Sequence, residues 1–151
     1  MDRDRVFLQM SYGLHRAIAD VSLPETQLPE PWADHFQGLP RQKATATVSV
    51  ELGPQWTVRT TAIWNEQKST YQYTDLDQEL MELVHWPSEL ILNGGLTWRS
   101  GGTGRWTMDL GCYNALDVDR NIVSPYNNGT VPLTLNGREW SGRLTYRLIE
   151  Q

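Results

Sequence analysis

Hydrophobic and polar residues alternate with a period of two along several stretches of the chain, and the clearest stretch is Lys43–Asn65. Because successive side chains of a β-strand point to opposite faces, this pattern predicts strands with one apolar and one polar face. Gly53 and Pro54 interrupt the alternation, which resumes at Trp56. The stretch therefore predicts an antiparallel hairpin. Its arms of about ten residues suit the roughly 9–11 residues of a tilted strand that crosses a bilayer.

The same alternation predicts seven strands in all, at 5–13, 16–22, 43–52, 55–65, 90–99, 105–114 and 138–148. The connections alternate in length: short ones fall at 13–15, 53–54 and 100–104, and long ones at 23–42, 66–88 and 115–137. The connection at 66–88 fits either one or two helical turns or a short hairpin. We therefore predict an all-β protein, an antiparallel up-and-down meander of about seven long strands that pair in sequence order.

Short turns at one end of a meander and long loops at the other are typical of an outer-membrane barrel. We therefore interpret residues 1–151 as part of a transmembrane β-barrel, with 23–42, 66–88 and 115–137 as external loops. A bacterial barrel needs at least about eight strands, and hydrocarbon does not tolerate an open sheet edge. The chain is accordingly expected to be a fragment of a longer barrel.

Tryptophan and tyrosine residues on the apolar face form two predicted belts. The belt near the short turns consists of Tyr12, Trp56, Trp98, Trp106 and Tyr146, and the belt near the opposite end consists of Trp64 and Trp140. Trp56 and Trp64 are about 26 Å apart along a strand, or roughly 20 Å after a tilt of ~40°. This is close to the ~25 Å apolar band between the aromatic girdles of membrane barrels. The alternative is that these rings cap the ends of a soluble core.

Charged residues within the strands all fall on the face opposite the aliphatic residues. They are Arg59, Arg99, Asp109 and Arg143. A charge that faces lipid costs about 2–4 kcal/mol at the bilayer midplane, so we expect these side chains to point into a lumen. The aliphatic residues expected on the convex face are Val48, Val58, Leu96, Leu110 and Leu144.

Composition and spacing argue against several other classes of protein. The net charge is −5 and no basic run occurs, which disfavours a nucleic-acid partner. No window of 18 apolar residues exists, and the N-terminus lacks the apolar core of a secretory signal. Cys112 is the single cysteine, and His15, His35 and His85 lack the spacing of metal ligands. We predict no catalytic, cofactor-binding or metal-binding residues, and no enzyme.

Three motifs at the end of the chain form a recognisable set. They are Asn114-Ala115-Leu116-Asp117, then Val131-Pro132-Leu133-Thr134-Leu135-Asn136-Gly137-Arg138-Glu139-Trp140, and finally Leu144-Thr145-Tyr146-Arg147-Leu148. The set resembles the C-terminal strands of TonB-dependent outer-membrane receptors, and Leu39–Ala44 is similar to the start of an earlier strand in that family. The resemblance covers roughly residues 38–148. It departs from the family at the end, where Leu148 stands in place of an aromatic residue.

The resemblance implies a segment of a plugged barrel of about 22 strands, here without its plug or signal peptide. It implies import of a scarce nutrient such as a ferric siderophore across the cell outer membrane. The implied partners are outer-membrane lipid, the remaining strands and plug, a small-molecule ligand, and the TonB complex through the plug only. Plausible ligand contacts in the external loops are Trp32, Phe36, Tyr71, Tyr73 and Tyr126. The alternative function is a soluble Trp-rich β-sandwich that acts as a carbohydrate-binding module.

Overall fold

The structure is a computed structural model that describes residues 5–16, 38–75, 80–101, 105–122 and 133–148. Every regular element in these ranges is a β-strand, so the predicted all-β class is confirmed. The strands are β1 (Val6–Leu14), β2 (Gln42–Leu52), β3 (Trp56–Asn65), β4 (Lys68–Asp75), β5 (Leu80–Trp86), β6 (Glu89–Arg99), β7 (Trp106–Tyr113), β8 (Asn121–Ile122), β9 (Leu133–Thr134) and β10 (Glu139–Tyr146). The described residues contain no helix that is long and apolar enough to span a membrane.

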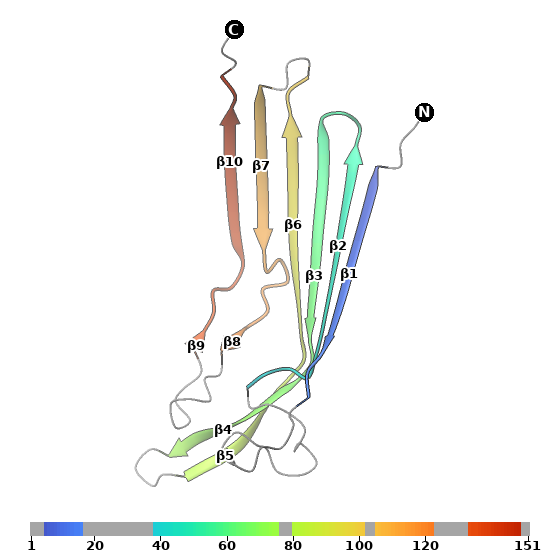
Figure 1. The fold of residues 1–151 in the computed structure, drawn as a ribbon. Helices are drawn as coiled ribbons and strands as arrows, with labels where there is room; N and C mark the ends of the chain where they lie inside the picture. Colours follow the sequence, from blue (N-terminus) through green and yellow to red (C-terminus); the bar gives the residue numbers. More distant parts are fainter. Residues whose placement is uncertain (1–4, 17–37, 76–79, 102–104, 123–132, 149–151) are drawn as a thin grey trace.

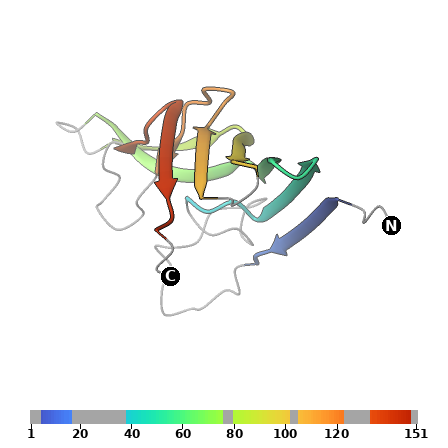
Figure 2. The same cartoon turned by 90° about the horizontal axis from the view of Figure 1, so that it is seen from above.

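Six of the strands form one antiparallel sheet in the order β1-β2-β3-β6-β7-β10 (Figure 1). Viewed from above, these strands follow an arc (Figure 2). The other strands form two small sheets, β4-β5 and β8-β9. The predicted antiparallel meander is therefore confirmed. Among the described residues the large sheet is a single curved layer, whereas a β-sandwich requires two packed layers, so the sandwich alternative is wrong.

The short and long connections lie at opposite ends of the sheet. The turn between β2 and β3 and the connection between β6 and β7 are at one end (Figure 1). Gly53 has a φ of 79° in the first of these turns, a backbone conformation that glycine adopts without steric cost. The strands β1, β3 and β7 end at the other end of the sheet, where β2, β6 and β10 begin. We call these the short-turn end and the long-connection end of the sheet.

The predicted pairing of the first two strands is wrong. We expected 16–22 to lie between 5–13 and 43–52, but β1 pairs directly with β2 over nine residue pairs, from Val6 with Val50 to Leu14 with Gln42. The backbone N–H of His15 extends this ladder by donating to the carbonyl of Arg41 at 2.7 Å. Residues 17–22 lie outside the described residues. The main sheet accordingly has six strands in place of about seven, because a period of two identifies the faces of a strand and not its partner.

The connection at 66–88 contains a hairpin, which settles the choice that the sequence left open. β4 pairs with β5 from Lys68 with Trp86 onward, with one irregularity near its tip. The hydroxyl of Ser69 lies 2.7 Å from Nδ1 of His85 across the hairpin, and Ser69 is buried. Lys68 Nζ donates to the carbonyl of Asn121 at 2.7 Å, which ties the base of the hairpin to β8. This hydrogen bond thus joins the connection between β3 and β6 to the connection between β7 and β10.

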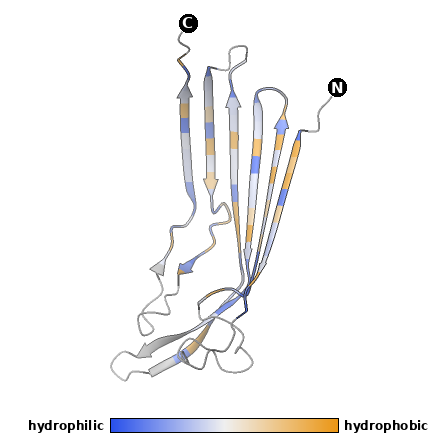
Figure 3. Ribbon diagram, in the orientation of Figure 1, coloured by the Kyte–Doolittle hydropathy of each residue, from blue (hydrophilic) through white to orange (hydrophobic). Residues whose placement is uncertain are grey.

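Most apolar side chains of the described residues are exposed. Ile91 is the one buried hydrophobic residue among them, whereas Trp140 is 77% exposed and Leu144 is 65% exposed. Hydrophobic and hydrophilic residues alternate along the strands (Figure 3). The sheet therefore presents an extensive apolar face without a protein layer over it, and large apolar surfaces of this kind mark contact with lipid or with another protein.

Candidate functional site

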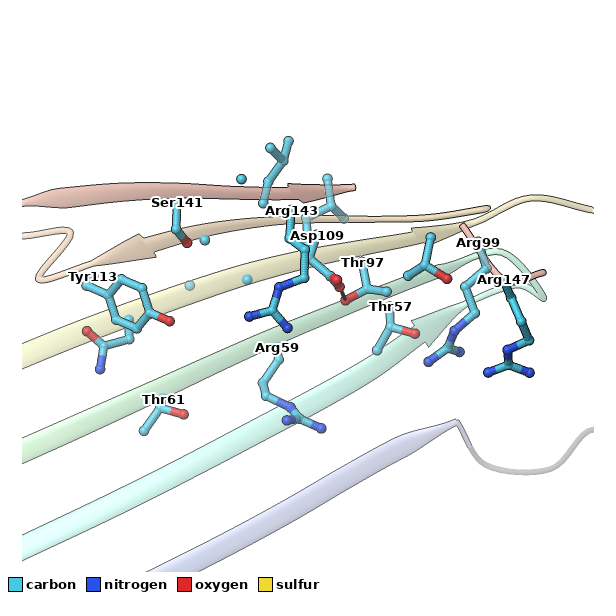
Figure 4. Close-up of a pocket in the computed structure, with 18 residues that line it drawn as sticks. Thr57, Arg59, Thr61, Thr97, Arg99, Asp109, Tyr113, Ser141, Arg143 and Arg147 are labelled. Atoms are coloured by element: carbon cyan, nitrogen blue, oxygen red, sulfur yellow. Dashed lines mark hydrogen bonds between the residues drawn. The ribbon is translucent and has the colours of Figure 1, made fainter. Parts of the chain in front are cut away.

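The polar face of the sheet lines a hollow on the inner side of the arc. Residues paired across neighbouring strands share a face, so the ladders arrange the polar residues in rows. One row consists of Thr57, Thr97, Asp109 and Arg143, and the next consists of Arg59, Gly95, Gly111 and Ser141. Both rows line a hollow of about 950 Å³ (Figure 4). Arg59, Arg99, Asp109 and Arg143 all line it, and the strand registers place them on the face opposite Val58, Leu96 and Leu110, as predicted.

The lining of the hollow is strongly cationic. Its guanidinium groups belong to Arg59, Arg99, Arg143 and Arg147, and its single carboxylate belongs to Asp109. Four positive charges against one negative charge leave a formal charge of +3 on the lining, whereas the whole chain carries −5. Asp109 is already engaged, because Oγ1 of Thr97 donates to its Oδ1 at 2.7 Å. Within the described part of the chain, none of these four arginines has an ion-pair partner.

Two glycines form the floor of the hollow. Gly95 and Gly111 face each other across β6 and β7, in the row between Arg59 and Ser141. A Cβ atom at Gly111 would lie 2.5 Å from the hydroxyl oxygen of Ser141, so any other residue at position 111 would require the Ser141 side chain to move. A Cβ atom at Gly95 would meet backbone oxygens at 3.8 Å and 3.9 Å, which is ordinary contact. A Cβ atom would therefore fit at Gly95 without a clash, and Gly95 borders the hollow with its backbone uncovered by a side chain of its own.

The outer face carries aromatic pairs at the short-turn end. The rings of Trp56 and Trp98 have centroids 6.4 Å apart, and those of Trp106 and Tyr146 have centroids 4.5 Å apart, both in tilted arrangements. Trp56, Trp106 and Tyr146 are exposed. These four residues occupy the end of the sheet to which the sequence assigned them. Such amphipathic rings suit a membrane–water interface.

Tyr12 lies at the opposite end from the one predicted. It pairs with Ala44, which in turn pairs with Trp64, so Tyr12 is near the long-connection end. Its hydroxyl donates to Oε1 of Gln42 at 2.8 Å. The error follows from the missed pairing of β1 with β2. A strand at 16–22 between them would have put the end of β1 at the short-turn end, whereas direct antiparallel pairing puts it at the long-connection end. Trp64 and Trp140 are both near the long-connection end of their strands.

Two of the residues proposed from the sequence as ligand contacts lie on a described strand. Tyr71 and Tyr73 are on β4, where their backbones pair with Leu83 and Met81. The structure thus places these two tyrosines two residues apart on one hairpin. Trp32, Phe36 and Tyr126 lie outside the described residues.

Asn114 anchors the end of β7, a role that sequence reasoning missed. Its backbone N–H donates to Oδ1 of Asn93 at 2.9 Å, and its side chain exchanges two hydrogen bonds with the backbone of Val118 at 2.9 Å and 3.0 Å. Asn114 has a φ of 48° and is 4% exposed. Asp117 then accepts a hydrogen bond from the N–H of Arg138 at 2.8 Å. The motif that begins at Asn114 therefore fastens β7 to β6 and to the segment that enters β10.

The part of the chain that the structure describes contains no metal-binding site. No group of three or more His, Cys, Asp and Glu side chains there is placed to hold a metal ion. Cys112 is a free thiol. The charged groups that line the hollow are the four guanidinium groups and the carboxylate of Asp109.

Comparison of the sequence and the structure with known proteins identifies the class of fold. No family model and no curated protein match the sequence. Among solved structures, the chain is similar to part of a protein chain in the structure of the FpvAI–pyocin S2 complex. The TM-score is 0.74 at 12% identity, and the match covers 93% of this chain and 17% of that chain. This chain thus has the all-β antiparallel meander of a segment of a TonB-dependent receptor barrel.

A second similar structure is the ferripyoverdine receptor of the outer membrane of Pseudomonas aeruginosa, bound to ferripyoverdine. The TM-score is 0.50 at 11% identity, and the match covers 94% of this chain and 25% of that chain. The chain therefore spans a quarter or less of the length of the two proteins that it matches. At these identities the likeness concerns the fold, and it is a likeness to a receptor and transporter barrel, a non-enzymatic class.

Proposed function

We propose that this chain forms a wall segment in the barrel of a TonB-dependent receptor of the cell outer membrane, which imports a scarce nutrient such as a ferric siderophore. The observation that carries the proposal is the structural likeness over 93% of the chain to a segment of such a receptor. The two faces of the sheet support it independently. One face carries exposed apolar side chains, a feature suited to lipid, and the other carries polar side chains that line a hollow.

In this proposal each part of the sheet has a distinct partner. The outer face contacts outer-membrane lipid, with the girdle formed by Tyr12, Trp56, Trp64, Trp98, Trp106, Trp140 and Tyr146. The outer edges of β1 and β10, which pair with no other described strand, pair with the remaining strands of the barrel. The concave face surrounds the plug, through which alone the TonB complex acts on the receptor.

The long connections in this proposal face the outside of the cell and contact the small-molecule ligand. The residues assigned to that contact are Trp32, Phe36, Tyr71, Tyr73 and Tyr126. Their aromatic rings offer large, rigid surfaces that lose little conformational entropy on binding.

Deletion of the gene that encodes this chain tests the proposal. In the natural host under iron limitation, we expect the deletion to abolish uptake of a radiolabelled ferric siderophore and the intact gene to restore it. A gene with Tyr71→Ala and Tyr73→Ala should restore less uptake than a control gene with Gly94→Ala, a change that meets no atom within 4 Å. The protein should fractionate with the outer membrane and resist extraction with carbonate. Recovery in the soluble fraction would overturn the proposal.

A further inference from the structure

The positive charge that lines the hollow is not balanced by the wall itself. Four guanidinium groups share the lining with the single carboxylate of Asp109, which already accepts a hydrogen bond from Thr97. In the part of the chain that the structure describes, none of the four arginines has an ion-pair partner. The lining therefore carries a formal +3, although the chain as a whole carries −5.

The acidic residues of the same face lie at the other end of the strands and are engaged. Glu89 begins β6, and its Oε1 accepts a hydrogen bond from Nδ2 of Asn65 at 2.7 Å. Glu139 begins β10, and its Oε1 accepts one from Nδ2 of Asn136 at 2.5 Å. Both strands begin at the long-connection end (Figure 1). The unbalanced charge is thus confined to the part of the concave face that runs from mid-strand to the short-turn end.

A surface that covers this lining removes water from the guanidinium groups. Arginine keeps its charge in proteins, so it cannot avoid the cost of burial by losing a proton. A charge that is buried without a partner is strongly destabilising. The covering surface must therefore supply acceptors, and carboxylates match the planar fork of the guanidinium group. Figure 4 shows the four guanidinium groups on the same side of the sheet, where one covering surface reaches them all.

The size of the lining fits an element of a folded protein. Gly95, the partner of Arg59, and Arg99 are four residues apart on β6, or about 13 Å at ~3.3 Å per residue. Across β3, β6, β7 and β10 the lining extends about 14 Å at ~4.8 Å per strand. The glycine floor lies between Arg59 and Ser141, so a protruding segment can approach the backbone there.

We propose that the plug of the receptor presents an acidic surface to this wall segment, with carboxylates opposite Arg59, Arg143 and the arginines nearer the short turns, Arg99 and Arg147. The inference rests on the proposed function, which assigns the concave face to the plug, and it adds the charge and the position of the contact. A neutral or basic plug surface would leave the arginines covered and without partners. The contact lies toward the short-turn end, where the unbalanced charge is.

Photo-crosslinking in the natural host identifies the surface that covers the lining. The receptor that contains this segment is expressed with all its strands and its plug, and with p-benzoylphenylalanine substituted for Thr57, which lines the hollow. We expect a cross-link to the plug, and mass spectrometry should locate it in a segment with a net negative charge. The control substitutes Leu144, which lies in the apolar row of Trp98 and Met108 and should give no cross-link to the plug.

Charge reversal tests whether the contact is ionic. Arg59→Glu combined with Arg143→Glu brings carboxylates against carboxylates, and such like-charge contacts are strongly unfavourable. We expect the purified variant receptor in planar bilayers to show a time-averaged conductance about tenfold or more above that of the original, because the plug is loosened. R59K/R143K keeps the charge and should stay nearly closed.

A matched control separates the lining from the rest of the wall. Arg105 is exposed and outside the hollow, so Arg105→Glu should conduct as the original receptor does, whereas Arg143→Glu alone should conduct more. Immunoblots of outer-membrane fractions compare the amounts of each variant. If the double variant is absent from the membrane, the cross-link from Thr57 decides the question.

Two results would overturn the inference and leave the proposed function intact. The first is a cross-link from Thr57 to a neutral or basic plug segment, or to a polypeptide other than the plug, in cells that still import the ferric siderophore. The second is an unchanged conductance of R59E/R143E in a receptor that reaches the membrane in normal amounts. A cross-link to an acidic plug segment in cells that import no ferric siderophore would instead support the contact and contradict the proposed import.

Discussion

Asn114 shows how one residue fixes the geometry of a strand end. Its positive φ lies in the left-handed region, which costs a residue with a Cβ atom about 1–2 kcal/mol unless local hydrogen bonds compensate. Here the side chain supplies two such bonds to Val118. Alanine at this position would keep the steric cost of the conformation and lose both hydrogen bonds.

We therefore expect Asn114→Ala to lower the free energy of local opening of the loop after β7 by about 2–3 kcal/mol. Two lost hydrogen bonds account for about 1 kcal/mol each, and the relaxation of neighbouring groups accounts for the rest. Amide hydrogen exchange of the chain in detergent measures this directly. Exchange at Val118 and Arg138 should accelerate roughly 30-fold or more, since about 1.4 kcal/mol corresponds to a factor of ten. Asn136→Ala is the control, because its side chain bonds Glu139 and not Val118. Equal exchange in Asn114→Ala and the original chain would refute this account.

Single residues were predictable from the sequence where their role depends only on the face of a strand. Arg59 and Arg143 were assigned correctly, because alternation fixes the face of every residue in a strand once the face of one is known. Tyr12 was assigned to the wrong end, because its position depends on a pairing with a strand distant in sequence. Ile63 breaks the alternation of β3, and the structure gives the reason: it pairs across the sheet with Ile91, which is buried. The two β-branched residues form an apolar spot on the largely polar face.

At the scale of elements, β3 illustrates how one strand serves two environments. Thr57 and Val58 are consecutive, yet Thr57 lines the hollow and Val58 pairs with Val50 and Leu96 on the opposite, apolar face. The two positions therefore provide a matched test of which face meets lipid.

We expect Val58→Arg to weaken partition into lipid vesicles by more than about 1 kcal/mol. Val58 lies between the belt at Trp56 and the midplane, and the cost of an arginine that faces lipid rises from about 0–1 kcal/mol at the interface to about 2–4 kcal/mol at the midplane. Thr57→Arg, on the lumen face, should change partition by less than about 1 kcal/mol, the cost expected of lumen and interfacial positions. Flotation of the chain with phosphatidylcholine vesicles measures both. If the threonine variant is the more damaging of the two, the assignment of the faces is reversed.

The pairing of the strands was less predictable from the sequence than their positions along the chain. The hairpin of β2 and β3 was evident because its two arms are adjacent in sequence and joined by Gly53 and Pro54. The pairing of β1 with β2 spans the residues from 15 to 41, and the local pattern contains no signal for it. The sequence contains a weak signal for the glycine floor, namely the glycines within predicted strands at Gly95 and Gly111. Glycine inside a strand often marks the close approach of a ligand or another backbone.

At the scale of the whole molecule, the sheet is an arc with two edges and two contrasting faces. Among the described residues, the outer edges of β1 and β10 have no partner strand. Unpaired N–H and C=O groups along such edges act as templates for further strands, and the exposed apolar face favours association.

The isolated chain is therefore expected to aggregate in plain buffer. In detergent it should give a β-type circular dichroism spectrum without a sharp unfolding transition, because the sheet lacks a closed hydrogen-bond network. Analytical ultracentrifugation in buffer and in detergent distinguishes these states. A compact monomer in plain buffer with a cooperative transition would contradict the assignment of the outer face to lipid.

The even number of strands in the main sheet has a consequence for how such walls change in evolution. Because six antiparallel strands make up the sheet, β1 begins and β10 finishes at the same end, the one with the short turns (Figure 1). A duplication or deletion of such a block, or of any whole hairpin within it, leaves every other connection on its original side of the bilayer. Loss or gain of one strand would instead transfer all later loops to the opposite compartment. Barrels built from this unit can therefore change circumference by recombination in steps of two strands, without inverting the surface that they present to the outside.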